Sequence, residues 1–248
     1  MVVAAGNPPA PSLVPSSAPT LDRICAALAP TLLRPQEVGA SGSRAAVALV
    51  VREQRGALEE SVFERPVELR APEAAGAELL LIRRAEHPND PWSGQMALPG
   101  GREDPGDATI LDTAVRETFE EVGLSLDRCA RLIGRLPPVP AMARGRSVGM
   151  TVVPLIFHLL DEAPLCTNYE VAEALWVPLA GLASGAWDTV VDYPIPGSRN
   201  ARARLPAWSV EGRVVWGLTH RMISTFLEVL DGAAPGPGRE ALSEEPPR

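Results

Sequence analysis

The sequence predicts a mixed α/β fold in which a central mixed β-sheet packs between helices. The apolar run at 45–51 and the segment ELLLIRR at 78–84 are typical of buried strands. Apolar residues recur at helical spacing over 21–33, 111–122 and 215–230, which predicts amphipathic helices. Because the two kinds of segment alternate along the chain, we expect them to share one layered domain.

The first half of the domain begins with the helix over 21–33 and continues with the first strand. Residues 52–77 are charged and interrupted by prolines, so we expect a loop or a hairpin excursion there. The next strand, over 78–84, ends in the neighbouring arginines Arg83 and Arg84. A polar loop, HPNDPWSGQ, follows and leads into a glycine turn.

The second half of the domain contains two more strand regions and the last helix. Residues 150–160 predict a strand, and Pro154 within it indicates an edge position or a bulge because proline donates no ladder hydrogen bond. Residues 174–182 predict a short strand that turns into a helix. In the last helix, over 215–230, apolar side chains fall on one side, as expected of a helix that packs on a core.

The two ends of the chain differ in composition from the rest. Residues 1–19 and 233–248 are rich in proline and small residues, which predicts flexible tails. Residues 20–232 contain no linker long enough to divide two domains, so we expect one domain there. The sequence has neither the pattern of a signal peptide nor a span of membrane-crossing length.

Charge and cysteine usage narrow the class of protein. The net charge of −8 argues against general nucleic-acid binding and against an anionic membrane surface. It does not argue against a small phosphorylated ligand, because one bound metal ion reverses the local field. Cys25, Cys129 and Cys166 are isolated from one another, which predicts buried reduced thiols and a cytoplasmic location.

The helix over 111–122 has a predicted start, a predicted stop and two different faces. Thr109 and Asp112 resemble a capping box, and Gly123 suits the left-handed residue that ends a helix. Leu124 is expected to supply the apolar contact of that cap. The core-facing stripe is predicted to contain Leu111, Val115, Thr118 and Val122, with Ala114 and Phe119 nearby.

Three carboxylates, Glu117, Glu120 and Glu121, stand at i, i+3 and i+4 on this helix. Such side chains repel one another unless a positive group lies among them, and a divalent cation bound through oxygens is the natural candidate. A turn at 99–101 precedes the helix, and its exposed backbone suits a metal or a phosphate. An acidic surface helix is the alternative, but the joined pattern of glycine turn, gap and carboxylates favours a site.

These residues resemble the Nudix box, Gly-x5-Glu-x7-Arg-Glu-U-x-Glu-Glu-x-Gly-U, in which U is a bulky aliphatic residue. The matching residues are Gly101, Arg116, Glu117, Glu120, Glu121, Gly123 and Leu124. Asp107 stands in place of the first Glu, the gap to Arg116 is one residue longer, and Thr118 replaces an aliphatic residue. The resemblance implies a Nudix-type α/β/α sandwich and hydrolysis of a pyrophosphate bond.

Two upstream segments make the chain similar to the coenzyme A diphosphatases of that superfamily. LLIRRA (80–85) and SGQMALPGG (93–101) match the subgroup at Arg84, Ala85, Gly94, Gln95, Ala97 and Pro99. Departures are Ile82, Leu98 and Asn89, together with the inserted HPNDPW. The resemblance implies cleavage of coenzyme A or acyl-CoA to 3′,5′-ADP and (acyl-)4′-phosphopantetheine. ADP-ribose or another nucleoside diphosphate derivative is the alternative substrate, and a non-catalytic nucleotide-binding regulatory module is the alternative of another class.

The resemblance also implies roles for individual residues. Glu117 and Glu121 are expected to hold Mg²⁺ or Mn²⁺, with Glu120 as a further ligand or a water-orienting group, and Gly101 is expected to add its carbonyl. Arg116 is expected to hold these carboxylates in place, which completes the catalytic set of Arg116, Glu117, Glu120 and Glu121. Arg83 and Arg84 end a strand near the glycine turn, and one of them either binds a substrate phosphate or is an ordinary surface or ion-pair arginine. The substrate-binding set is Arg83, Arg84, Gln95 and Gly100.

Several assignments stay open at this point. A general base is not located; Glu170 and Glu173 are candidates, with an ordinary surface position as the alternative. Trp92 either stacks on an adenine or anchors its loop. His87, His158 and His220 are interpreted as structural. The expected partner is a small nucleotide substrate similar to coenzyme A, with no nucleic acid and no membrane, and a homodimer is compatible with the sequence.

Overall fold

The computed structural model describes residues 19–32, 42–54, 76–88, 90, 92–143, 146–194 and 202–232. Residues 1–18 and 233–248 of the predicted tails lie outside these ranges, as do Asn89 and most of the predicted excursion at 52–77. Pro19, assigned to the first tail, is buried, and its carbonyl accepts a hydrogen bond from the amide of Ala77 at 2.9 Å.

Helices are interspersed among runs of three or four strands along the described part of the chain, so the fold is mixed α/β as predicted. The helices are α1 (Leu21–Leu32), α2 (Ile110–Val122), α3 (Leu126–Cys129), α4 (Leu179–Ala183) and α5 (Gly217–Leu230). The strands are β1 (Ser43–Glu53), β2 (Ala77–Arg84), β3 (Met96–Ala97), β4 (Gly100–Arg102), β5 (Ala130–Arg135), β6 (Val139–Ala143), β7 (Arg146–Leu159), β8 (Val171–Pro178), β9 (Asp188–Pro194), β10 (Arg202–Val210) and β11 (Arg213–Trp216).

A mixed eight-stranded sheet forms the centre of the fold. Its main path is β3-β2-β1-β7-β5, with β8 beside β2, β4 beside β1 and β6 beside β7. The β1–β7 pair is parallel and its neighbours are antiparallel. β1 pairs with β2 only at 51–53, because its other end pairs with β4 while the far end of β2 pairs with β3. β1 and β2 therefore separate, and the segment 96–102 lies between them.

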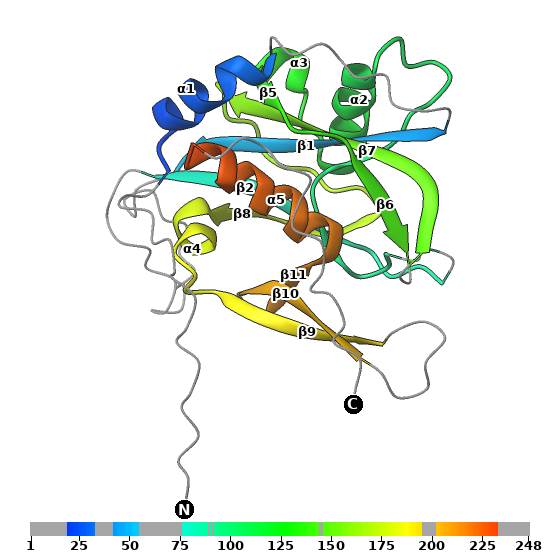
Figure 1. Cartoon of the computed structure of the whole chain (residues 1–248). Helices are drawn as coiled ribbons and strands as arrows, with labels where there is room; N and C mark the ends of the chain where they lie inside the picture. The colour runs from blue at the N-terminus through cyan, green and yellow to red at the C-terminus, as the bar shows by residue number, and fades with distance from the viewer. Residues whose placement is uncertain are drawn as a thin grey trace, which may run out of the picture.

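Helices cover both faces of this sheet, so the domain is an α/β/α sandwich (Figure 1). Along β1, Leu49 and Val51 belong to the core shared with α1 and α5, whereas Ala48 and Val50 belong to the core shared with α2 and α3. Successive side chains of a strand point to opposite faces, so an uninterrupted apolar run is what a strand buried on both faces requires.

Pro154 lies in a central strand, so the predicted edge position is wrong. β7 has β1 on one side, and β5 followed by β6 on the other. The carbonyl of Pro154 accepts from the amide of Leu136, in the connection where β5 gives way to β6. Pro154 lacks an N–H group on the side where β5 ends and β6 begins. No continuous strand needs that hydrogen bond there, so a proline is tolerated in this central strand.

A second sheet of three antiparallel strands, β9, β10 and β11, was not predicted from the sequence. It lies below α5 and β8 in the view of Figure 1. Trp208, Val210 and Val215 attach it to the core that contains α1 and α5. The last helix consequently begins at Gly217, because the preceding residues belong to β11.

Two predictions from composition are tested by this fold. No helix among the described residues is long and apolar enough to cross a membrane. The three cysteines are free thiols, as predicted, but only Cys129 is buried; Cys25 is partly exposed and Cys166 is exposed.

Candidate active site

Helix α2 is fixed at both ends by the residues that the sequence predicted. The Thr109 side chain accepts from the amide of Asp112, and the Asp112 carboxylate accepts from the amide of Thr109 at 2.8 Å. Gly123 ends the helix in the left-handed conformation, with φ of 72°. The amides of Cys166 and Asn168 donate to the last carbonyls of the helix. These contacts hold the carboxylate-bearing turn against the loop before β8.

The core-facing side of α2 differs from the predicted stripe at two residues. Phe119, expected near the core, is 56% exposed, and Glu121, an acidic residue, is only 2% exposed. The helix is rotated so that Ile110, Ala114 and Val122 pack on the sheet. The segment at 96–102, inserted between β1 and β2, offers Glu121 a polar neighbour, which explains why a carboxylate occupies a buried position.

Thr118 is buried beneath α2, and its hydroxyl has no hydrogen-bond partner among the described residues. A buried unpaired hydroxyl costs about 1–3 kcal/mol. We expect Thr118→Val to raise the free energy of unfolding by about 1 kcal/mol, measured by urea denaturation. Thr113 is the matched control, because its buried hydroxyl donates to Asp107 at 2.9 Å. Thr113→Val should destabilise by a similar amount; a loss of stability in both variants would contradict the assignment.

Glu117 and Glu121 both face the glycine turn that precedes α2. The amide of Gly100 donates to Oε2 of Glu121 at 2.8 Å. A Cβ built on Gly101 would lie 2.4 Å from Cδ of Glu117, so only glycine leaves room for that carboxylate. The turn and the helix thus bring two acidic groups together. The Gly100 amide, expected to bind a substrate phosphate, is instead engaged by Glu121.

The Gly101 carbonyl already accepts one hydrogen bond within the sheet. The amide of Ala48 donates to Pro99, and the amide of Glu103 donates to the carbonyl of Arg44. Hydrogen-bonded pairs alternate in an antiparallel ladder, so Ala46 and Gly101 form the bonded pair between them. The Gly101 carbonyl therefore has one lone pair left for a further ligand.

Burial and mutual repulsion act together on the acidic pair. Burial raises the pKa of Glu121 to about 7, although the Gly100 amide and Arg84 favour its ionised form. Burial also raises the pKa of Glu117, and the charges of Glu120 and Glu170 act in the same direction. Glu170, a candidate base, thus lies within electrostatic reach of both carboxylates. The site concentrates negative charge that a cation would stabilise.

Arg116 connects Asp107 to two of the predicted carboxylates. Asp107 accepts from Nε at 3.0 Å and from Nη2 at 2.9 Å, so the pair is bidentate. Arg116 also donates to Glu117 at 2.9 Å and to Glu120 at 3.3 Å. The hydrogen bonds from Arg116 hold the pKa of Asp107 well below its usual range. Asp107 stands where the family motif has a Glu, and it orients the arginine that positions Glu117.

Arg84 reaches the acidic pair from the end of β2. Its Nη1 lies 3.8 Å from Oε1 of Glu121, and its Nε donates to Asp90 at 2.8 Å. Asp90 also accepts from the amide of Trp92 at 2.9 Å. Asp90 was not singled out in the sequence, although it lies in the inserted HPNDPW. This loop therefore holds Arg84 beside Glu121.

Arg83 and Gln95 do not join the acidic pair. They line a separate cavity of about 510 Å³ together with Glu173. Arg213 lowers the pKa of Glu173, and Arg83 adds to this effect. Glu173 is consequently a firmly ionised partner of two arginines, which makes it a poor general base. Trp92 anchors its loop, because its indole donates to the carbonyl of Met142 at 3.3 Å.

The donor set fits a divalent cation through two carboxylates. No three His, Cys, Asp or Glu side chains in the described ranges surround one metal position. The Glu120 side chain is 51% exposed and forms an ion pair with Arg116, so it is not part of the acidic pair of Glu117 and Glu121. Glu117, Glu121 and the remaining lone pair of Gly101 are hard oxygen donors of the kind that Mg²⁺ and Mn²⁺ accept.

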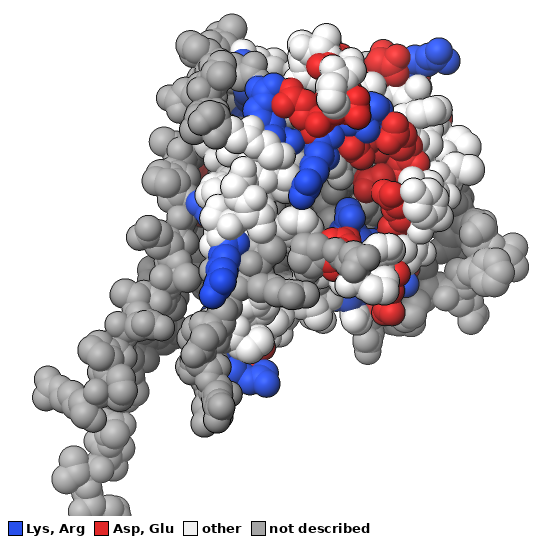
Figure 2. Space-filling model, turned by 90° about the vertical axis from the view of Figure 1, so that its right-hand side faces the viewer, with Lys and Arg blue, Asp and Glu red and all other residues white. Residues whose placement is uncertain are grey.

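Acidic and basic side chains lie in neighbouring areas on one face of the molecule. On the face that Figure 2 presents, Asp and Glu side chains gather in one area and Arg side chains border it. Such an arrangement suits a ligand that brings both a metal ion and phosphate groups.

Comparison with known proteins agrees with this geometry. A family model described as the NUDIX domain matches residues 69–193. An uncharacterized Nudix hydrolase, NudL, of Yersinia pestis (strain Pestoides F) is 34% identical over 146 residues, which are 58% of this chain and 68% of that protein. A protein of the same name from Yersinia pseudotuberculosis serotype O:1b (strain IP 31758) matches over the same shares at the same identity.

Solved structures give weaker likenesses. A MutT/nudix family protein from Enterococcus faecalis has a TM-score of 0.42 and 14% identity, covering 80% of this chain and 64% of that one. The NUDIX domain of Shewanella oneidensis NrtR, solved with ADP ribose, has a TM-score of 0.37 and 18% identity, covering 61% and 82%. At these TM-scores the family assignment depends on the sequence matches. The sequence matches show that the chain belongs to the Nudix family and is a Nudix pyrophosphohydrolase, and the acidic pair beside the glycine turn agrees with this assignment.

Proposed function

We propose that this chain cleaves the pyrophosphate bond of coenzyme A or acyl-CoA, releasing 3′,5′-ADP and (acyl-)4′-phosphopantetheine. The class of reaction follows from the family, which acts on nucleoside diphosphate derivatives. The choice of coenzyme A is supported by the residues at 80–85 and 93–101 that resemble the coenzyme A diphosphatases. The observation that carries the proposal is the approach of Arg84 to Glu121 beside Gly100.

The proposal includes Mg²⁺ or Mn²⁺ held by Glu117 and Glu121, with the Gly101 carbonyl as a third donor. When bound, the metal supplies charge neutralisation for the diphosphate and an activated water. Glu120, which is exposed and bonded to Arg116, orients water rather than completing the inner set. Glu170 is the remaining candidate for accepting a proton from that water, since its charge acts on both acidic residues.

Arg84 and Arg116 have distinct tasks in this proposal. Arg84 is 27% exposed and is held by Asp90, so its guanidinium is placed to bind a substrate phosphate oxygen beside Glu121. Arg116 is occupied by Asp107, Glu117 and Glu120 and keeps the carboxylates in place. Fixing both groups before the substrate arrives lowers the reorganisation needed during the reaction.

Two other functions compete with this one. ADP-ribose or another nucleoside diphosphate derivative would use the same acidic pair and the same arginine, so this rival differs only in the groups flanking the diphosphate. A non-catalytic nucleotide-binding module would need no acidic pair. The preserved Glu117, Glu120 and Glu121 favour catalysis over that third function.

A substrate panel with identification of products separates these functions. Purified full-length chain is incubated with Mg²⁺ and, in parallel reactions, with coenzyme A, acetyl-CoA, ADP-ribose and diadenosine tetraphosphate. We expect 3′,5′-ADP and 4′-phosphopantetheine from coenzyme A, identified by mass spectrometry. Turnover of ADP-ribose alone would replace the coenzyme A proposal, and turnover of none of the four, with nucleotide still bound, would favour the non-catalytic module.

A further inference from the structure

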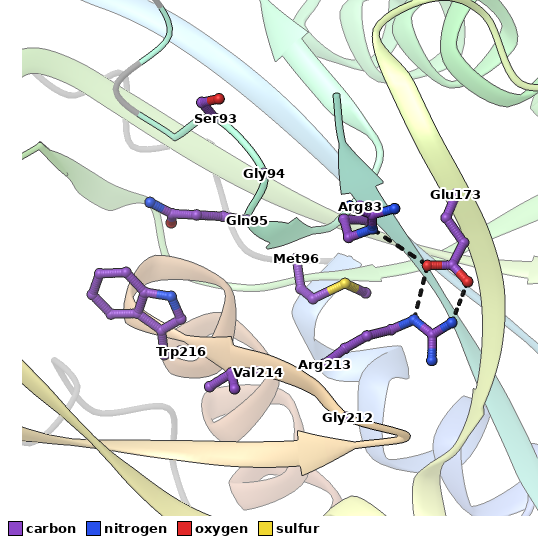
Figure 3. Close-up of a pocket in the computed structure, with 10 residues that line it drawn as sticks. All are labelled: Arg83, Ser93, Gly94, Gln95, Met96, Glu173, Gly212, Arg213, Val214 and Trp216. Carbon is purple, nitrogen blue, oxygen red and sulfur yellow. Dashed lines mark hydrogen bonds and ion pairs between the residues drawn. The ribbon is translucent and has the colours of Figure 1, made fainter. Parts of the chain in front are cut away.

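A cavity on the opposite face of β2 from the acidic pair has the composition of a nucleoside site. Its lining includes Trp216 and Gln95 at one end and Arg83, Glu173 and Arg213 at the other, with Met96 between them (Figure 3). The volume is about 510 Å³, within the range of small-molecule sites. Arg213 and Trp216 belong to β11, outside the residues that the NUDIX family model matches.

One end of this cavity holds an arginine with unused hydrogen-bond donors, although the two arginines there are balanced in charge by Glu173 and Glu211. The Arg213 guanidinium donates to Glu173 through Nε and Nη2 and to Glu211 through Nη1, so all three nitrogens are engaged. Arg83 contacts the same Glu173 only through Nε, at 3.4 Å. Within the described part of the chain, the terminal nitrogens of Arg83 have no hydrogen-bond partner. Because Arg213 engages both carboxylate oxygens of Glu173, the terminal N–H groups of Arg83 remain available to an anion.

The other end of the cavity offers an aromatic surface and an unused amide. The Trp216 ring is supported from the side by Tyr193, whose centroid lies 5.3 Å away. The Gln95 carboxamide reaches the same end, and among the described residues it has no hydrogen-bond partner. Indole rings stack on nucleobases, and a glutamine side chain pairs with the N6 and N7 edge of adenine.

The cavity and the acidic pair adjoin the same end of β2, on opposite faces of the sheet. Arg83 in the cavity and Arg84 beside Glu121 are consecutive residues of β2 whose side chains leave opposite faces. Met96 lines the cavity and Gly100 bonds Glu121, and these two residues are four apart, so at most about 14 Å of chain joins the two places.

We propose that this cavity binds a purine nucleoside bearing a phosphate on its ribose, with the base on Trp216 and Gln95 and the ribose phosphate on Arg83. This deepens the proposed function and rests on it for the identity of the nucleotide. The β10–β11 hairpin then supplies the base-stacking surface through Trp216, and its Arg213 engages Glu173 so that Arg83 can bind the ribose phosphate. Glu173 is a positioning residue, because it acts on the ligand only through Arg83.

Calorimetric titration of the full-length chain with adenosine 3′,5′-bisphosphate and with adenosine tests this site. EDTA is present, so that a metal at the acidic pair makes no contribution. We expect Trp216→Leu to weaken binding of both ligands by roughly five- to a hundredfold, because it removes base stacking. Trp216→Phe, which keeps an aromatic face, should retain most of the affinity, and circular dichroism checks the fold of each variant.

Arg83→Gln separates the phosphate contact from the base contact. It should weaken the bisphosphate roughly tenfold or more and leave adenosine nearly unchanged. Arg204→Gln and Val190→Ala, exposed residues of the same small sheet outside the cavity lining, should change neither affinity. Absence of bisphosphate binding, or equal affinity in wild type and Trp216→Leu, would overturn the site. Failure of coenzyme A hydrolysis with these binding results intact would overturn the proposed function alone.

Discussion

Glu121→Gln should lower kcat by at least about a hundredfold while the fold stays intact. Loss of one metal-binding carboxylate removes several kcal/mol of charge stabilisation, and each 1.36 kcal/mol corresponds to a factor of ten in rate. The glutamine keeps an oxygen for the Gly100 amide, and it removes a buried charge whose pKa is already raised to about 7. We therefore expect the free energy of unfolding to stay within about 1 kcal/mol of wild type.

The measurement pairs steady-state kinetics on the best substrate of the panel with urea denaturation. Glu228→Gln is the control, because Glu228 is an exposed carboxylate on α5, away from the site. Its kcat should equal that of wild type. An unchanged rate in Glu121→Gln would remove this residue from the catalytic machinery, whereas a collapsed fold would show that its role is structural.

Gly100→Ala and Gly101→Ala should fail in different ways although the residues are adjacent. A Cβ on Gly100 would lie 2.2 Å from the backbone oxygen of Ala46, and its φ of 147° disfavours other residues. We expect this variant to lose about 3 kcal/mol or more of stability. A Cβ on Gly101 would instead meet the flexible Glu117 side chain. That variant should stay folded but lose about a hundredfold in kcat/KM, since a displacement of about 1 Å is enough.

Gly106→Ala, in the connection between β4 and α2, is the matched control, because the nearest atom to its added Cβ is a side-chain oxygen of Asp104 at 3.3 Å. Thermal denaturation and kinetics of the three variants distinguish the roles. We expect lost stability at 100, lost activity at 101 and neither loss at 106, which a general effect of adding a methyl group would not produce. Equal losses of stability at 100 and 101 would contradict the separate roles, as would a fully active Gly101→Ala enzyme.

Local signals in the sequence were sufficient for α2 and for the two central strands. The capping box at Thr109, the stop at Gly123 and the apolar run of β1 each act within a few residues of the structure that they specify. The acidic pair followed from the same helix, because residues one turn apart on a helix are neighbours whatever the rest of the fold does.

Other features depend on contacts between distant segments. Periodicity placed Phe119 near the core, but it does not show that the 96–102 segment approaches Glu121 and leaves Phe119 exposed. In β9, partly buried and exposed residues alternate but none is buried, so the strand lacks the apolar run that marks a core strand. The cavity combines residues from β2, β3, β8 and β11, and no single segment carries its signature.

The central claim is that Glu117 and Glu121 bind a divalent cation together with a nucleoside diphosphate. Electron paramagnetic resonance of free Mn²⁺ during titration of the chain measures this directly, with adenosine 5′-(α,β-methylene)diphosphate as a ligand that is not cleaved at its methylene bridge. We predict that wild type removes Mn²⁺ from solution and that the double variant Glu117→Gln, Glu121→Gln does so far more weakly. Equal binding in the two proteins, or none in wild type with the nucleotide present, would contradict the account.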